Sequence, residues 1–348
     1  MPEFVLPAYG FDKETSLMEP FGSGLINSTW KVTAFGNSFI LQRVNDAVFR
    51  EPEAIADNIR LVAIYLKEHF PAYPFIAPLI AAGGNEMVYI KEKGFYRMFP
   101  FVPGSHSKDV VQTPEQAFEA AVQFGRFTHL LSGLDATQLR LTIPSFHDLE
   151  LRYDQFKQAL ENGNRERIQN SRELIEQLQS RAFIVDQFKL IRKNPAFKLR
   201  VTHHDTKISN VLFDEKDKGI CVIDLDTLMP GYFISDVGDM MRTYLSPVNE
   251  EETDYSKIEV REDFYKAIVK GYYQEMKEEL TSTEKQYFFY AGEFMIYMQA
   301  LRFLTDHLNN DIYYGAKYQG HNYNRAFNQA TLLDALINKQ PQLEGFML

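Results

Sequence analysis

The sequence has a single cysteine and a single tryptophan among 348 residues, and it has no apolar run long enough to cross a bilayer. One cysteine, Cys221, excludes internal disulfides and metal sites made of several cysteines. Positive charge is also scarce, since the formal net charge is -10 at pH 7, whereas nucleic-acid binding requires a basic face. These shortages argue against a disulfide scaffold, a membrane-spanning protein and a nucleic-acid-binding protein.

The start of the sequence, MPEFVLPAYGFDKE, has neither the basic residues nor the apolar stretch of a secretory signal peptide, so we expect a cytoplasmic protein. The most hydrophobic window, residues 287–304, contains Glu293, Gln299 and Arg302, and it is therefore expected to be a buried helix rather than a membrane span. With 45% hydrophobic residues and a length above that of an average domain, the chain should form two lobes.

The most informative stretch is residues 201–242. It predicts two short apolar strands, at 210–213 and 220–223, that are joined by a charged turn and followed by a helix. Polar side chains stand at the ends of both strands in a fixed order, with the pattern His-x-Asp-x-x-x-x-Asn before the turn and an aspartate after the second strand. These residues are His203, Asp205, Lys207, Asn210 and Asp224.

This order suits phosphoryl transfer from ATP. The reaction requires a carboxylate that takes the proton of the acceptor hydroxyl, and oxygen ligands for the Mg²⁺ that bridges the phosphates. Asp205 has the position of the base, and Asn210 and Asp224 have the positions of the metal ligands. Lys207 would bring an ammonium group near the transferring phosphate.

Each of these residues also has a structural explanation. A His-x-Asp sequence in a loop is usually a turn in which the aspartate caps the backbone, and an aspartate after a strand often caps the next helix. The complete set, in order on one strand-turn-strand frame, favours a kinase site as the hypothesis.

The motifs resemble those of the aminoglycoside phosphotransferase and choline kinase superfamily, which are small-molecule kinases similar to protein kinases in fold. More narrowly, VTHHDTKISNVL with VIDLDTLMPG resembles the N-acetylhexosamine 1-kinases. A weaker likeness covers most of the chain, including GSGLINSTW, ILQRVN and LRFLTDHLNNDIYY. The resemblance implies a two-lobed α+β fold, with ATP as the phosphoryl donor, Mg²⁺ as cofactor and a small sugar as acceptor. It also implies that Asp236 orients the catalytic loop.

Residues 1–98 are expected to form the small, sheet-rich lobe that binds the nucleotide. The turn at Gly22, Ser23 and Gly24 precedes a strand, and its glycines would let backbone N–H groups approach the phosphates, although an ordinary hairpin turn explains the same residues. The strand at 39–44 places Gln42 where kinases usually carry a lysine or arginine for the α- and β-phosphates.

A Pro- and Gly-containing segment at 99–104 is expected to be the hinge, where adenine would bond to the backbone at Phe99 and Phe101. A plain interdomain linker would have the same composition. Residues 105–348 are then the mainly helical lobe that carries the catalytic loop and the acceptor site.

Arg302 and Asp306 lie four residues apart on a predicted helix, so a simple salt bridge between them is one explanation. The resemblance instead implies that Arg302 contacts the acceptor sugar, and we place Asp306, Tyr314 and Asp205 beside it as further acceptor-binding residues.

These observations predict an ATP-dependent sugar kinase that phosphorylates a hydroxyl, the anomeric one, of an N-acetylhexosamine. Leu25 stands where the resembled group often has a histidine that contacts the sugar, which leaves another hexose open. A kinase for an aminoglycoside or choline fits the same motifs, and a non-catalytic nucleotide- or sugar-binding module is a candidate of a different class. The presence of the base Asp205 argues against the binding module, because such a module needs no base.

Overall fold

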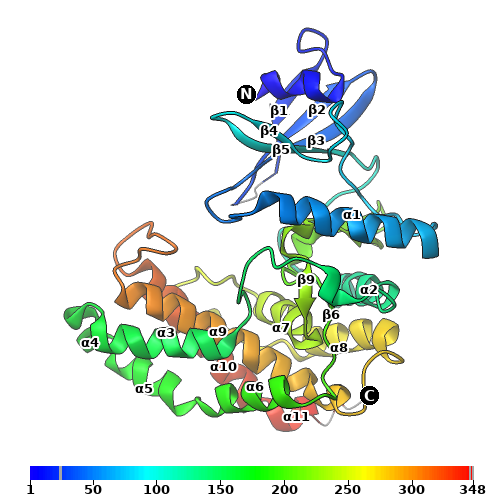
Figure 1. Cartoon of the computed structure of the whole chain (residues 1–348). Helices are drawn as coiled ribbons and strands as arrows, with labels where there is room; N and C mark the ends of the chain where they lie inside the picture. Colours follow the sequence, from blue (N-terminus) through cyan, green and yellow to red (C-terminus); the bar gives the residue numbers. More distant parts are fainter. Residues whose placement is uncertain (23–25, 345, 347–348) are drawn as a thin grey trace.

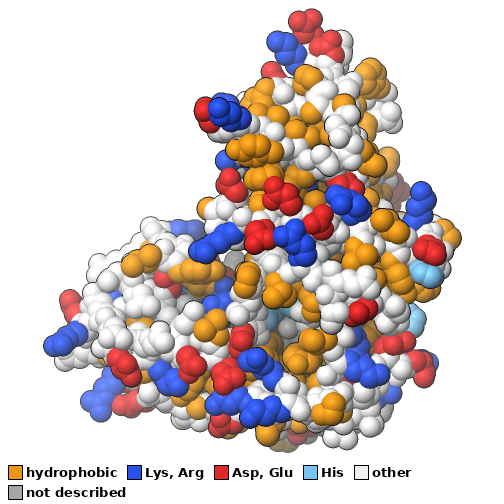
Figure 2. Space-filling model, in the orientation of Figure 1, with side chains coloured by type: hydrophobic (Ala, Val, Ile, Leu, Met, Phe, Trp, Pro, Cys, Tyr) orange, Lys and Arg blue, Asp and Glu red, His pale blue; other side chains and the backbone are white. Residues whose placement is uncertain are grey.

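The protein consists of a small sheet-rich lobe stacked on a larger helical lobe (Figure 1). The computed structural model describes residues 1–22, 26–344 and 346. Figure 2 shows that hydrophobic side chains gather on the small lobe, whereas basic and acidic side chains are intermixed along the large lobe on the same face.

The small lobe is built on a five-stranded antiparallel sheet with the order β1-β2-β3-β5-β4. Val32, Leu41 and Met98 are buried on one face of this sheet against the short 3-10 helix η1. The bounds are η1 Glu3–Tyr9, β1 Leu17–Pro20, β2 Ser28–Ala34, β3 Asn37–Val44, β4 Val88–Ile90 and β5 Gly94–Pro100.

Helix α1, at Pro52–His69, lies between the sheet and the large lobe (Figure 1). As the periodicity predicts, its apolar face is formed by Ile55, Ile59, Val62 and Leu66, and these side chains belong to the core of the large lobe. Buried Asn58 reinforces this attachment, since its amide bonds to the backbone N–H and C=O of Arg140 and to the C=O of Leu228. Helix α1 therefore lies within residues 1–98, the predicted small lobe, but its apolar side chains pack into the core of the large lobe.

The large lobe packs its helices around α9, whose residues are almost all buried. This confirms the prediction that the hydrophobic window at 287–304 is a buried helix. In the described part of the chain, every helix is too short or too polar to serve as a membrane span. The helices are α2 Pro114–Leu130, α3 Leu149–Asn162, α4 Arg165–Asn170, α5 Arg172–Ser180, α6 Phe183–Lys193, α7 Phe233–Tyr244, α8 Glu262–Met276, α9 Phe288–Leu308, α10 His321–Asn338 and α11 Gln340–Glu344.

Two small sheets lie at the top of the large lobe, below the five-stranded sheet. One sheet pairs the two strands that flank residues 203–228, which we call the catalytic stretch, and the other sheet is the hairpin within this stretch. The bounds are β6 Arg200–Thr202 with β9 Met229–Gly231, and β7 Val211–Phe213 with β8 Gly219–Val222. The strand-turn-strand prediction is confirmed with boundaries one residue different.

Capping fixes the starts of several helices. The hydroxyl of Thr113 accepts a hydrogen bond from the N–H of Gln116 at 3.3 Å at the start of α2. Thr281 and Glu284 form a reciprocal capping box, in which Glu284 N–H donates to the Thr281 hydroxyl at 3.1 Å and Thr281 N–H donates to the Glu284 carboxylate at 2.9 Å. The Glu284 carboxylate also pairs with buried Arg200 at 2.7 Å, which ties the box to β6.

A pH dependence of stability follows from Glu293, which is buried in α9. Burial, with a smaller effect of Glu344, raises the pKa of Glu293 to about 7. The folded state therefore holds this proton more tightly than the unfolded state, so stability should fall as pH rises from the unfolded pKa and level off above about 7. The loss is on the order of 3 kcal/mol.

The test compares urea unfolding of the wild type and Glu293→Gln between about pH 5 and about pH 8. The amide cannot ionise, so this part of the decline should disappear in the variant. Equal declines in both proteins would contradict the assignment.

Candidate active site

The catalytic stretch is a loop that two aspartates of α7 hold in place. The Asp236 carboxylate accepts hydrogen bonds from the N–H groups of His203 and His204, at 3.1 and 2.7 Å. The Asp239 carboxylate accepts one from the N–H of Thr206 at 2.7 Å. All five residues are buried. The structure thus gives Asp236 the positioning geometry that the sequence resemblance implied.

The His203 side chain connects this loop to the following hairpin. Its Nε2 lies 2.9 Å from the C=O of Ile223, and its Nδ1 accepts the N–H of Asp205 at 3.3 Å. The ring packs edge-on against Phe124 with centroids 5.1 Å apart. Burial lowers the pKa of His203, which favours the neutral ring that these two contacts require.

The Asp205 carboxylate lies between an amide and an ammonium. Asn210 Nδ2 donates to Asp205 Oδ2 at 3.0 Å and to its C=O at 2.8 Å, and Lys207 Nζ lies 3.2 Å from Oδ2. Although burial opposes charge, Asp205 and Asp224 raise the pKa of Lys207, which keeps the ammonium protonated. The three predicted residues are therefore in direct contact.

The β7–β8 hairpin brings Asn210 and Asp224 together. Val211 pairs with Val222 in the ladder, and the N–H of Ile223 donates to the C=O of Asn210 at 2.9 Å. Asp224 follows at once, with a left-handed backbone at φ 61°. This conformation is uncommon for a residue with a side chain and tends to occur at functional sites.

Asn210 and Asp224 fit a magnesium ion that also binds phosphate oxygens. Burial, followed by repulsion from Asp226 and Asp205, raises the pKa of Asp224 to about 7, and a bound cation would relieve this repulsion. Asn210 turns its Nδ2 toward Asp205, which leaves its Oδ1 available. The described residues contain no cluster of three or more His, Cys, Asp or Glu in metal-binding arrangement, but Mg²⁺ needs only one or two protein ligands when phosphates and water supply the rest.

Arg97 was not predicted as a site residue, yet it brings a positive charge from the small lobe to an aspartate of the large lobe. It lies on β5 directly opposite Gln42 of β3, and the Gln42 carbonyl accepts bonds from its Nε and Nη2 at 3.1 and 2.8 Å. Its Nη1 lies 2.5 Å from Asp226 Oδ1, in a pair whose side chains are 1% and 3% exposed. Gln42 therefore holds the cation of the neighbouring strand. The cross-strand register that creates this pairing carries no local sequence signal.

The glycine turn is described in part. Ser23, Gly24 and Leu25 lie outside the described residues, whereas Gly22 has φ 78°. Beyond the turn, Asn27 Nδ2 donates to Asp226 Oδ2 at 2.7 Å, which is a second link between the lobes.

At the hinge, Phe99 pairs with Ile40 in the ladder, and the N–H of Phe101 donates to the C=O of Ser38 at 3.1 Å. This amide is therefore already bonded within the sheet, and adenine contact at Phe99 and Phe101 stays a prediction.

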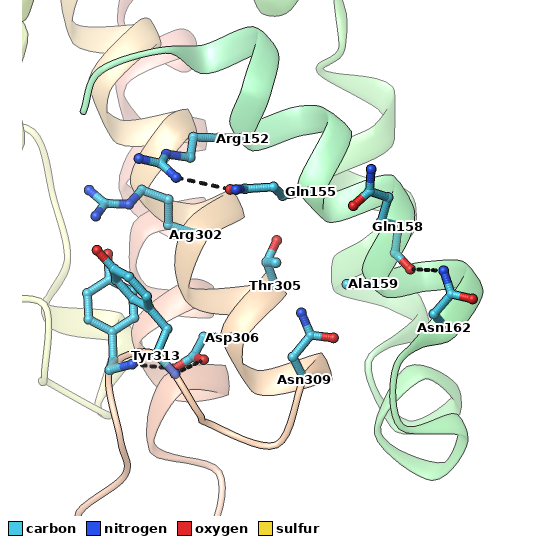
Figure 3. Close-up of a pocket in the computed structure, with 11 residues that line it drawn as sticks. Arg152, Gln155, Gln158, Ala159, Asn162, Arg302, Thr305, Asp306, Asn309 and Tyr313 are labelled. Carbon is cyan, nitrogen blue, oxygen red and sulfur yellow. Dashed lines mark hydrogen bonds between the residues drawn. The ribbon is translucent and has the colours of Figure 1, made fainter. Parts of the chain in front are cut away.

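A cavity of about 410 Å³ lies between α3, the end of α9 and the loop that follows α9 (Figure 3). It opens into a larger cleft of about 2420 Å³ that Asp205 and Lys207 also line. Arg302 and Tyr314 line both, and acceptor binding by these residues stays a prediction. Arg152 of α3 lines both as well and was not predicted.

Asp306 does not pair with Arg302, contrary to the salt-bridge explanation. Its carboxylate accepts the N–H groups of Tyr313 and Tyr314 at 2.7 and 2.9 Å, and Asn322 Nδ2 at 3.1 Å. Asp306 thus shapes the loop that carries the two tyrosines, although it also lines the cavity.

The Phosphotransferase enzyme family matches residues 18–277 of the chain. An aminoglycoside phosphotransferase from Alicyclobacillus acidocaldarius has a similar structure, with a TM-score of 0.64 and 12% identity over 99% of this chain and 97% of that one. A microcompartment-associated aminopropanol kinase has a TM-score of 0.63 and 15% identity over 99% of this chain and 97% of that one. A spectinomycin phosphotransferase in complex with ADP and spectinomycin has a TM-score of 0.58 and 13% identity over 97% of both chains. These similarities confirm the predicted two-lobed, protein-kinase-like fold.

The buried pair of Arg97 and Asp226 predicts a strong coupling in stability. Arg97→Met should destabilise the protein by about 3–5 kcal/mol, because Asp226 would remain as a buried charge. The double variant Arg97→Met with Asp226→Asn should recover much of this loss. Urea unfolding of the four proteins in the cycle measures the coupling.

Arg43→Met is the matched control, since Arg43 is the next residue of the same strand and its side chain is exposed. It should cost less than about 1 kcal/mol. Additive effects of the two changes at Arg97 and Asp226 would contradict the coupling.

Proposed function

We propose that this chain, which belongs to the phosphotransferase enzyme family, transfers the γ-phosphoryl group of ATP to an N-acetylhexosamine, at its anomeric hydroxyl. The family membership makes it a small-molecule phosphotransferase. The identity of the acceptor is the part that we propose.

One observation carries the proposal: the Asp205 carboxylate, which Asn210 and Lys207 hold in place, lines a cleft that shares Arg302 and Tyr314 with a cavity of about 410 Å³, large enough for a monosaccharide. In this position Asp205 would accept the proton of the acceptor hydroxyl as the O–P bond forms. Lys207 would offset the negative charge of the transferring group. Positioning and charge stabilisation supply most of the catalysis in reactions of this type.

ATP is proposed as the donor because ADP is bound in the complex of the similar spectinomycin phosphotransferase. Asn210 and Asp224 would hold Mg²⁺, which when bound neutralises phosphate charge. Gly22, Ser23, Gly24, Gln42, Phe99 and Phe101 remain the proposed nucleotide contacts, with Arg97 added beside Gln42.

An N-acetylhexosamine is favoured over choline or an aminoglycoside by the charge of the cavity. Arg152 and Arg302 both line it, and these guanidinium groups would repel a cationic acceptor. Tyr314, whose ring lies 5.5 Å from the Arg302 guanidinium, offers a face against which a pyranose could stack. The resemblance of VTHHDTKISNVL and VIDLDTLMPG to the N-acetylhexosamine 1-kinases supports the same choice.

Asp205→Asn should reduce turnover by about 10²- to 10⁴-fold, because the amide cannot accept the proton. Binding of ATP should survive, since the proposed nucleotide contacts are on other residues. The measurement pairs a sugar-dependent ADP-release assay with calorimetric titration of ATP.

The acceptor is identified by a screen of N-acetylglucosamine, N-acetylgalactosamine, other hexoses, choline and aminoglycosides. Phosphorus NMR of the product reads the position of the new phosphate. The expected product is a 1-phosphate, and absence of turnover with every acceptor would overturn the proposal.

A further inference from the structure

Two arginines in the acceptor cavity have only neutral partners. Arg152 projects from α3 and Arg302 from α9, and their guanidinium groups lie close together on the same side of the cavity (Figure 3). Among the described residues, no carboxylate lies within 4.0 Å of either group to form an ion pair. A chain with a formal charge of -10 has many carboxylates available, so this arrangement needs an explanation.

The Arg152 guanidinium is held by uncharged oxygens. Its Nη1 donates to Gln155 Oε1 at 3.0 Å, and its Nη2 donates to the C=O groups of Ser145 and Phe146 at 3.0 and 3.3 Å. Its Nε is buried and has no hydrogen-bond partner. Burial, followed by the positive charge of Arg302, lowers the pKa of Arg152.

Arg302 is held in a similar way. Its Nη1 donates to Gln299 Oε1 at 3.2 Å, and its guanidinium lies 5.6 Å from the ring of Phe146 and 5.5 Å from the ring of Tyr314. The two rings orient the guanidinium group but do not neutralise it. Two like charges are therefore held side by side in a partly buried position, which is unfavourable until an anion arrives.

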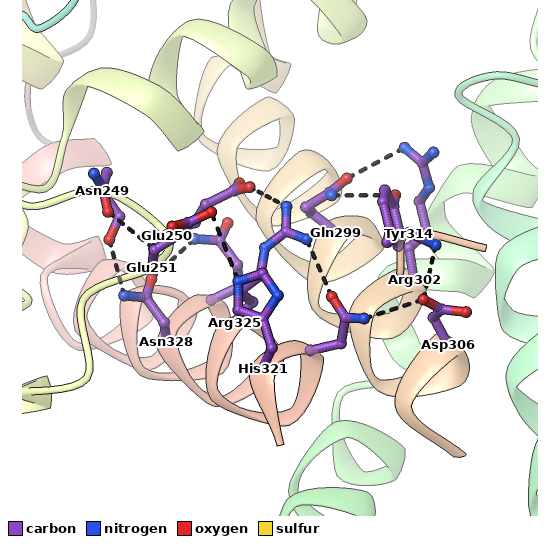
Figure 4. A network of polar contacts seen from close by, with 12 residues as sticks. Asn249, Glu250, Glu251, Gln299, Arg302, Asp306, Tyr314, His321, Arg325 and Asn328 are labelled. Carbon is purple, nitrogen blue, oxygen red and sulfur yellow. Dashed lines mark hydrogen bonds and ion pairs between the residues drawn. The ribbon is translucent and has the colours of Figure 1, made fainter. Parts of the chain in front are cut away.

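Of the other arginines that line this cleft, Arg50 is exposed, whereas Arg242 and Arg325 pair with carboxylates. Arg325 pairs with Glu250 (Figure 4). Arg242 pairs with the same glutamate and with Asp239. Asp306 lines the same cavity as Arg302, yet its carboxylate is occupied by the N–H groups of two tyrosines and by Asn322. Among the described residues, Arg152 and Arg302 are thus the two partly buried arginines of this cleft that have no carboxylate partner.

We infer that the acceptor carries an anionic substituent, namely a carboxylate, sulfate ester or phosphate ester, which Arg152 and Arg302 bind together. The inference rests on the proposed sugar kinase function and specifies its acceptor. Guanidinium groups form short, strong hydrogen bonds with such oxyanions. The substituent would lie in the cavity of about 410 Å³, with the reacting hydroxyl toward Asp205 in the adjoining cleft.

A neutral sugar explains the arrangement less well. An arginine can donate to hydroxyl or acetyl oxygens, but a neutral ligand would displace water from two charges and leave their repulsion in place. A cationic acceptor would add a third positive charge. A preference for a neutral acceptor and a preference for a cationic acceptor are therefore two possible results of the experiment described next.

The experiment compares kcat/KM for N-acetylglucosamine, its 6-sulfate, its 6-phosphate, glucuronic acid and the cation choline with the wild-type enzyme. The best anionic acceptor should exceed the neutral sugar by about 10- to 100-fold, which is the usual gain from hydrogen bonds to a charged group. The three anionic arms identify the substituent. Rising salt should lower kcat/KM for the anionic acceptor and leave that for the neutral sugar nearly unchanged.

Arg152→Gln and Arg302→Gln should each reduce the ratio of anionic to neutral kcat/KM by about tenfold or more. The ratio is independent of the fraction of folded enzyme, because that fraction affects both acceptors equally. Arg152→Lys and Arg302→Lys keep the charge and should retain part of the preference. Arg192→Gln is the matched control, because Arg192 pairs with Asp148 and Glu150 outside the cavity and should leave the ratio unchanged.

Turnover of neutral or cationic acceptors as fast as or faster than the anionic ones would overturn this inference and leave the sugar kinase proposal standing or redirect it to a cationic acceptor. An unchanged ratio in both glutamine variants would also overturn it. Absence of turnover with every acceptor is the separate result that removes the proposed function itself.

Discussion

The concentration of carboxylates between the two lobes is the constraint on which the site depends. Five aspartates share this region, and each needs compensation because burial opposes their charge. Backbone N–H groups compensate Asp236 and Asp239, and Arg242 also pairs with Asp239. Arg97 and Lys207 supply cations to Asp226 and Asp205. Asp224 has no ion pair within 4.0 Å among the described residues, and repulsion from its neighbours raises its pKa further. The five are Asp205, Asp224, Asp226, Asp236 and Asp239.

The proximity of the proposed catalytic and metal-binding residues could be predicted from the sequence because short-range geometry brings them together. Asn210 and Asp224 flank a hairpin of two short strands, so their proximity follows from the pairing of these strands. Capping at Thr113 and Thr281 is equally local, because each hydroxyl accepts a hydrogen bond from the N–H three residues further along the chain.

Contacts that join distant segments could not be predicted in the same way. The pairing of Gln42 with Arg97 depends on the register between two strands that a helix and a long loop separate in the chain. The sequence spacing of Arg302 and Asp306 suggested a salt bridge, yet the loop after α9 supplies backbone N–H groups that occupy the carboxylate instead. In both cases, segments distant from the expected partner determine which groups the side chain contacts.

The ion pair between Arg97 and Asp226 also restricts how the protein can move. It joins β5 of the small lobe to the turn after β8, and the bond from Asn27 to Asp226 joins the same point to the strand that follows the glycine turn. Any motion that separates the lobes at this point has to break the buried ion pair and the bond from Asn27. The contacts at Asp226 therefore favour rotation of one lobe relative to the other about this point over separation of the lobes at it.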